Sequence, residues 1–330
     1  MFVTMHDDLL PIAAMERAVD IVLSSPHPTS KVSAALFGRD LNGDDYIIAR
    51  TNRWPERIEQ CFTHDDRIGN SSGTIHAETA CILAAPYTKD ASICVTDPFC
   101  PNCAKNIVEA GIKAVYIDHK GFIKDFAARR GHDFENMSLK IVERAGIAIF
   151  EVIRKDKIIQ PIQIPKEGYR PKSANPPIIK ALEQAPSMTL FLNEVNAAKN
   201  IYDDDTPFCV ALSEDRHRAL YSITLSAHLS RGIKKGSEAE APAHQLEQKY
   251  NYTIPPLNRL MIGAHKYGHR VLDDYIYLSH IPSGRELINL MGESGQQKLF
   301  FDKRENMTKY SSPQALAQLT QAGLVKAEYI

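Results

Sequence analysis

The chain has 330 residues, of which 44% are hydrophobic and 24% are charged, and its formal net charge is -1. This length suggests two domains, at roughly 150 residues each, and the composition is that of an ordinary globular protein. The near-zero net charge leaves binding to nucleic acid open but unsupported, because contacts to a phosphate backbone require clustered Lys and Arg.

The first residues, Met1 to Asp7, run directly into acidic side chains and lack the apolar stretch of a signal peptide. No apolar run approaches the roughly 20 residues that a membrane helix needs. We therefore expect a cytoplasmic protein with no membrane contact. In that reducing compartment, a pair among the six cysteines is more readily interpreted as metal ligands than as a disulfide.

Apolar residues at helical spacing predict a first helix over Leu9–Leu23. A β-hairpin follows, in which an Asn-Gly turn connects strands over Lys31–Phe37 and Tyr46–Arg50. Residues 52–73 are polar, too irregular for a regular element and too long for a plain turn. Loops of this kind are usually functional or mobile.

The next helix is predicted over His76–Ala85, with His76 and Glu78 in its first turn. Free backbone N–H groups and the positive end of the helix dipole favour an anionic or metal-bound oxygen there. A buried strand over Ser92–Thr96 comes next, followed by a Cys-x-x-Cys motif at Cys100.

One imidazole and two thiolates, from His76, Cys100 and Cys103, are three suitable ligands for a tetrahedral Zn²⁺. Three protein ligands leave the fourth position for water, which is typical of catalytic rather than structural zinc. Glu78 lies beside this set and is expected to carry protons.

Helices and strands alternate through the rest of the first half. The predicted elements are a helix over Pro101–Ala110, a strand over Ala114–Ile117, a helix over Asn136–Ala145 and a strand over Ile147–Val152. Since a helix separates each pair of consecutive strands, the usual crossover makes these strands parallel.

The combination of His-x-Glu with a later Cys-x-x-Cys is similar to the signature of zinc nucleobase deaminases. Residues from about 5 to 155 resemble the cytidine and deoxycytidylate deaminase superfamily, in its deoxycytidylate and tRNA adenosine deaminase branch, where a helix separates the fourth and fifth strands. The resemblance implies an α/β protein with the three-layer α/β/α cytidine deaminase-like fold and a five-stranded mixed sheet. It also implies one Zn²⁺ per chain, held by His76, Cys100 and Cys103, with Glu78 as the catalytic residue.

The resemblance further suggests substrate contacts. Asn52 stands where such enzymes place an Asn that binds a ribose hydroxyl, although a turn Asn is the alternative. Ala77 would offer its backbone N–H to a base carbonyl, and Thr96 would lie beside the ring. Trp54, the only tryptophan, either stacks on a base or anchors its loop. Phe99 replaces the Pro that usually precedes the first Cys, which alters the pocket floor.

Prolines then interrupt the chain, and we predict three regions: a zinc-dependent deaminase domain (1–155), a Pro-rich linker (156–188) and a second α/β domain (189–330).

Internal similarity suggests that this second α/β domain is a duplicate of the first. Ile276–Leu287 aligns with Ile93–Ala104, so that Ser283 and Glu286 replace the two cysteines, and Leu257–Leu260 falls roughly over Ile75–Glu78. A degenerate deaminase domain without zinc ligands and a chance alignment of similar elements both remain open.

We therefore expect a zinc-dependent hydrolase, forming a homodimer, that deaminates a small nucleoside, nucleotide or base, most naturally of the cytidine or dCMP type. Deamination of adenosine in tRNA or RNA is the alternative within the same chemistry, although the chain shows no basic patch. A catalytically silent binding or scaffold protein is the alternative from another class.

Overall fold

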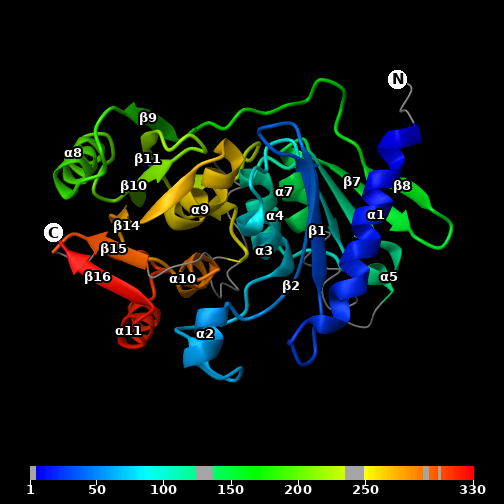
Figure 1. Ribbon diagram of the computed structural model, residues 1–330, viewed down its shortest axis with the longest axis horizontal. Coiled ribbons are helices and arrows are strands. Elements are labelled where there is room, and N and C mark those ends of the chain that lie inside the picture. Colours follow the sequence, from blue (N-terminus) through cyan, green and yellow to red (C-terminus); the bar gives the residue numbers. More distant parts are fainter. Residues whose placement is uncertain (1–4, 124–136, 235–248, 293–296, 304–305) are drawn as a thin grey trace.

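The computed structural model describes residues 5–123, 137–234, 249–292, 297–303 and 306–330, and these form two mixed six-stranded sheets (Figure 1). The first sheet contains, in pairing order, β2 (Asp45–Thr51), β1 (Ser33–Arg39), β5 (Ser92–Val95), β6 (Ala114–Asp118), β7 (Ala148–Ile153) and β8 (Ile158–Gln163). The second sheet contains β16 (Val325–Tyr329), β15 (Gln297–Phe301), β14 (Arg270–Leu278), β10 (Phe208–Glu214), β11 (Leu220–Ser226) and β9 (Ile178–Leu182).

The first sheet follows the predicted hairpin and crossovers. Strand β1 is antiparallel to both β2 and β5, whereas β5, β6 and β7 are mutually parallel. The prediction of five strands is corrected to six, because β8 adds antiparallel to β7 at the edge. Pro161 lies within β8, and an edge strand tolerates a residue that cannot donate a ladder hydrogen bond.

Helices cover both faces of this sheet. One face packs against α1 (Met5–Ile21), whose Ala14 and Met15 contact alternate strand residues such as Ala35 and Cys94. The intervening strand residues face the opposite side, as the period of two requires. On that side lie α3 (Ala77–Ala84), α4 (Pro101–Glu109) and α7 (Leu139–Arg144).

Five strands of the second sheet repeat the order and directions of five strands of the first, whereas the sixth strand lies at the other edge, since β8 pairs with β7 and β9 pairs with β11. Strands β11, β10, β14, β15 and β16 correspond in turn to β2, β1, β5, β6 and β7, with the same antiparallel and parallel pairs. The helices correspond as well: α8 (Met188–Lys199), α9 (Pro256–Tyr267), α10 (Gly284–Leu290) and α11 (Pro313–Gln321) follow α1, α3, α4 and α7. The α/β architecture predicted for the first half is present there, and the second half has the same arrangement of five strands and four helices.

The structure fixes the register between the halves. Ser283 is the N-cap of α10 as Cys100 is the N-cap of α4, which agrees with the predicted alignment. Before α9 the alignment needs a shift of three residues, because the N-cap there is Pro255, which takes the place of His76 in α3, whereas the predicted alignment placed Asn258 there. The second half therefore has Pro255, Ser283 and Glu286 at the three ligand positions.

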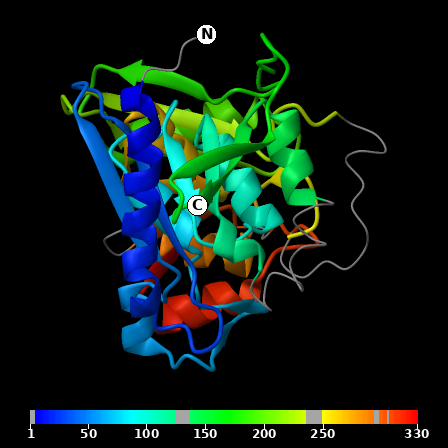
Figure 2. The ribbon, with the colours of Figure 1, turned by 90° about the vertical axis from the view of Figure 1, so that its right-hand side faces the viewer.

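The helical layers of the two halves pack face to face, so that the order is α1, first sheet, two layers of helices, second sheet and α8 (Figures 1 and 2). A single buried cluster includes Ala104 and Ile107 of α4 together with Leu257 and Leu260 of α9. The halves consequently share one hydrophobic core.

Two stretches differ from their predictions. Residues 52–73 are not irregular throughout, since they contain α2 (Glu56–Cys61) and a two-stranded ribbon of β3 (Arg67–Ile68) and β4 (Ser71–Ser72). The β3–β4 ribbon is held by contacts with the second half, which local sequence does not encode. The stretch 156–188, predicted as a linker, contributes the edge strands β8 and β9.

The remaining described elements are short: a 3-10 turn (Val22–Ser24), α5 (His119–Phe122), β12 (His228–Leu229) and β13 (Thr253–Ile254). Within the described ranges, no helix has both the length and the apolar character needed to span a bilayer.

Candidate active site

Two helix N-termini bring the predicted ligands together. His76 is the N-cap of α3 in an extended conformation, and Glu78 lies in the first turn, buried at 3% exposure. Cys100 is the extended N-cap of α4, and Pro101 occupies the first helical position, where its missing N–H has no helical partner to lose. Cys103 follows within the first turn. Both helices thus direct the positive ends of their dipoles toward the thiol groups.

A buried hydrogen bond fixes the two helices relative to each other. The side-chain amide of Asn106 donates to the Thr79 hydroxyl at 3.0 Å, and both residues are buried. Since Thr79 directly follows Glu78 and Asn106 lies one turn after Cys103, this contact joins the N-terminal part of α3 to that of α4.

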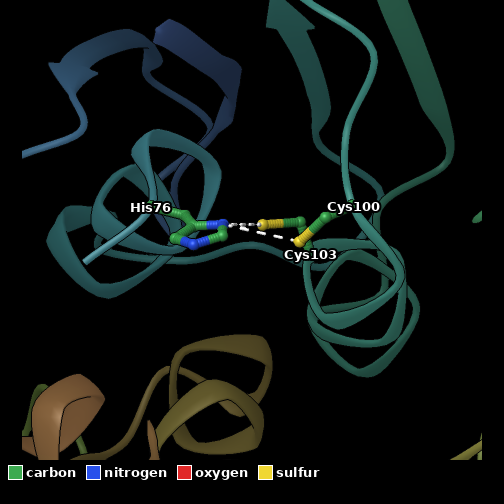
Figure 3. A group of neighbouring side chains, drawn as sticks. All are labelled: His76, Cys100 and Cys103. Atoms are coloured by element: carbon green, nitrogen blue, oxygen red, sulfur yellow. Dashed lines mark hydrogen bonds between the residues drawn. The ribbon is translucent and has the colours of Figure 1, made fainter. Parts of the chain in front are cut away.

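The three predicted ligands form a compact donor set (Figure 3). His76 Nδ1 lies 3.2 Å from Cys103 Sγ and 3.5 Å from Cys100 Sγ, and the three donor atoms lie within 4.8 Å of one another. Zn–N bonds near 2.0 Å and Zn–S bonds near 2.3 Å in a tetrahedron place such atoms roughly 3.5 to 3.8 Å apart. The donor types and their spacing therefore fit Zn²⁺. In the described part of the chain, no other His, Cys, Asp or Glu group shows this arrangement.

Burial and neighbouring groups control the charge at this site. Burial raises the pKa of the Cys103 thiol well above its ordinary value, and the adjacent Cys100 and Glu78 side chains raise it further. The influence of Glu78 on this thiol shows that its carboxyl group reaches the donor set. A bound cation would offset these effects, because metal ligation favours the thiolate.

Two predicted substrate residues are engaged in the scaffold. Asn52 Oδ1 accepts from Val32 N at 2.9 Å and Ser25 Oγ at 2.8 Å, and its Nδ2 donates to Ser30 O at 2.8 Å. Asn52 thereby holds the segment 25–32 against the end of β2. Thr96, next to the end of β5, donates its hydroxyl to the buried Asp97 carboxylate at 2.8 Å.

Trp54 packs against two histidine rings in the structure. Its ring is buried and stacks on His64, with centroids 3.8 Å apart, and on His27, with centroids 5.8 Å apart. A base could stack on Trp54 only by displacing one of these imidazoles. This contact was not predictable from the sequence, because it depends on how the segment that contains His27 and the loop that contains His64 fold onto Trp54.

Ala77 and Phe99 are both fully buried beside the ligands. Ala77 opens α3, so its backbone N–H has no partner within the helix. Phe99 belongs to the core cluster that the two halves share.

The contacts that sequence reasoning missed come from the second half. Arg285 and Gln318 bind the backbone of the segment preceding His76. These contacts link residues more than 200 positions apart, and no local pattern indicates them.

A cavity of about 460 Å³ lies elsewhere, between the β1–β2 turn and the equivalent β10–β11 turn. Asp40, Asn42 and Arg216 are among its lining residues, and none of the predicted site residues is. Because these turns lie at the opposite ends of their strands from the donor set, we place the chemistry at the helix N-termini.

The fold and the donor set together define an α/β protein of the deaminase class. No family model matches the chain. An uncharacterized deaminase in the luxG 3' region of Aliivibrio fischeri is 31% identical over 126 residues, which cover 38% of this chain and 81% of that relative. The chain belongs to the cytidine and deoxycytidylate deaminase superfamily.

Solved structures of dCMP deaminase from the cyanophage S-TIM5 are also similar. The complex with dCMP and dUMP shares 20% identity, covering 44% of this chain and 97% of that chain, with a TM-score of 0.31. The apo form shares 21% identity, covering 37% and 93% respectively, with a TM-score of 0.26.

Proposed function

We propose that the chain is a zinc-dependent hydrolytic deaminase of a nucleoside, nucleotide or nucleobase, of the cytidine or dCMP type. The main support is the position of Glu78, buried beside the donor set of His76, Cys100 and Cys103 at the N-termini of two packed helices. Membership of a deaminase family supports the reaction type.

His76, Cys100 and Cys103 would hold the zinc ion, which supplies the Lewis acidity that makes water a nucleophile near neutral pH. Glu78 accepts a proton from the attacking water and delivers it to the ring nitrogen, then assists protonation of the leaving amine. A C–O bond forms at the ring carbon bearing the amino group, the C–N bond breaks, and ammonia leaves.

Substrate contacts are part of this proposal. The free N–H of Ala77 is suited to the base carbonyl, while Thr96 and Phe99 would shape the ring pocket. Asn52 would bind a ribose hydroxyl after giving up the hydrogen bond that its Nδ2 donates to Ser30 O. Trp54 would contribute by anchoring the loop that contains it.

We propose that 1–155 is the catalytic domain and 189–330 a degenerate deaminase domain, joined through 156–188. The repeated strand order supports a duplication, and Pro255 and Ser283 are unsuitable replacements for zinc ligands. One zinc ion per chain is therefore expected.

A homodimer and a cytoplasmic location remain predictions. The outer surface of helices α3 and α4 is already covered by α9, so a second copy of the chain would have to bind another surface. Light scattering of the purified chain would measure its mass.

The test is to incubate zinc-loaded protein with cytidine, dCMP, adenine, guanine, a pterin and tRNA, and to measure released ammonia and bound zinc. Ammonia from cytidine or dCMP is expected. Release only from tRNA would favour the adenosine alternative. Zinc binding without ammonia from any substrate would overturn the proposal in favour of a binding protein.

A further inference from the structure

Side chains of the second half bind the backbone segment that leads into the proposed metal site. Arg285, at the start of α10, is 7% exposed and donates from Nη1 to the carbonyl oxygen of Thr74 at 2.6 Å. Its Nη2 lies 3.3 Å from Ser72 Oγ and 3.4 Å from Ser72 O. Thr74 is two residues before His76, so the Arg285 guanidinium holds the backbone close to a proposed metal ligand.

Gln318 of α11 makes a two-point contact slightly earlier in the same segment. Its Oε1 accepts from the Gly69 N–H at 2.7 Å, and its Nε2 donates to Arg67 O at 3.1 Å. Figures 1 and 2 both show α11 beside the segment that contains α2. The Gln318 amide thus supplies hydrogen-bond partners to backbone groups at the outer side of the β3–β4 ribbon.

Close packing reinforces these polar contacts. A Cβ atom at Gly284 would lie 2.8 Å from the carbonyl oxygen of Ile68 and 3.0 Å from Ser71 Oγ. The first turn of α10 therefore touches the ribbon through backbone, which leaves little freedom for movement.

The first half makes the reciprocal contact. Lys105 of α4 is buried and donates to Thr253 O at 3.3 Å. Thr253 is two residues before Pro255, the N-cap of α9, as Thr74 is two residues before the N-cap of α3. Each half therefore uses a buried basic side chain to hold the entry to the other half's equivalent helix. Only the entry to α3 bears a metal ligand.

Within the first half, Ile75 exchanges two backbone hydrogen bonds with Arg53, at 2.8 and 3.2 Å. The strand entering His76 is thus fixed by Arg53 from its own half and by Arg285 from the other. Metal sites need their ligands held within about 0.5 Å by such supporting contacts.

We propose that Arg285 and Gln318 are positioning residues for the metal site, which hold residues 67–74 so that His76 and Glu78 keep their geometry. The proposed function supplies the identity of the metal. The degenerate motif of the second half would then serve to brace the intact motif of the first.

The test measures the rate at which zinc passes from the folded full-length chain to a chromophoric chelator. Lys at position 285 keeps the charge but cannot reach Thr74 and Ser72 together. We expect Arg285→Lys to release zinc roughly 10- to 100-fold faster, as for other groups that orient metal ligands. Gln318→Ala, at a half-buried surface position that should still fold, should act in the same direction.

Arg259→Lys is the matched control. Arg259 is equally buried and also crosses between the halves, but it binds Glu109 at the far end of α4, at 3.2 Å. Its variant should lower the melting temperature without changing zinc release. Unchanged release in both Arg285→Lys and Gln318→Ala, or equal acceleration in Arg259→Lys, would overturn the proposal. If the parent binds zinc but deaminates no substrate, the proposed function fails while the release rates still decide this inference.

Discussion

Glu78 is the residue on which the proposed reaction depends most directly. Gln is nearly isosteric but cannot accept and return a proton, so Glu78→Gln should retain zinc and lower kcat by at least about 100-fold. Zinc content and ammonia release from the same preparation measure the two effects. The control is Glu56→Gln, in the first turn of α2, where the side chain is exposed. Full activity of Glu78→Gln would remove Glu78 from the mechanism.

The residues of the donor set were predictable because their chemistry is local. His76 with Glu78, and Cys100 with Cys103, each form a short motif at a helix start, and the structure brings the three predicted ligands together. The surroundings of Asn52 and Trp54 were not predictable. Their partners lie in loops whose approach depends on the folded chain, as with the His27 and His64 rings on Trp54.

At the scale of elements, α10 begins with a helix cap at the positions that correspond to Cys100 and Cys103 of α4. Ser283 and Glu286 form a capping box, in which Ser283 N donates to Glu286 Oε2 at 2.9 Å. Glu286 Oε1 also accepts from Leu257 N at 3.2 Å, which joins the starts of α9 and α10. The residues at the positions of the two cysteines therefore serve helix initiation instead of metal binding.

This capping box should have a measurable dependence on pH. Burial raises the pKa of Glu286 above its ordinary value of 4.5, so the folded chain holds this proton more tightly than the unfolded chain. The contribution of Glu286 to stability should thus fall as pH rises from 4.5 through the raised pKa, and then level off. The Glu286→Gln variant should lack this pH-dependent contribution to stability.

The measurement is the unfolding free energy of the parent minus that of Glu286→Gln, determined with urea at a series of pH values. This difference in free energy should become more negative as pH rises from 4.5 through the raised pKa of Glu286. The exposed Glu56→Gln again reports the general effect of removing a carboxylate. A difference that is constant with pH, or that becomes more positive, would show that Glu286 has no raised pKa in the folded state.

Helices and strands were predictable from the sequence wherever one face of the element is buried, because apolar residues then recur with the period of that element. Strands β1, β5 and β6 and helices α3 and α4 lie where the pattern predicts, apart from small shifts at their ends. The elements β3, β4 and β8 were missed because their stability comes from neighbours. Strand β8 is largely exposed, and the β3–β4 ribbon is held by Gln318 and Arg285.

At the scale of the whole molecule, the shared core predicts that the halves unfold together. Gly232 tests this coupling, because it has φ +83° and a Cβ atom there would lie 1.8 Å from the carbonyl oxygen of Arg144 at the end of α7. The Arg144 oxygen belongs to the backbone and cannot rotate away as a side chain could, so an added methyl group must push the second half away from the first. Gly323→Ala is the control, with φ +70° but nothing within 4 Å.

Gly323→Ala should lower the free energy of unfolding by only the roughly 1 to 2 kcal/mol that a left-handed backbone costs a residue with a side chain. Gly232→Ala should lower it by clearly more. Trp54, the only tryptophan, reports the first half by fluorescence, whereas far-ultraviolet circular dichroism reports both halves. In urea the two signals should share one midpoint in the parent, as a cooperative unit requires. In Gly232→Ala both midpoints should fall together, even though the substitution lies in the other half from Trp54. A fluorescence midpoint that stays fixed while the dichroism shifts would show that the halves unfold independently, and the second half would then be too loosely attached to brace the metal site.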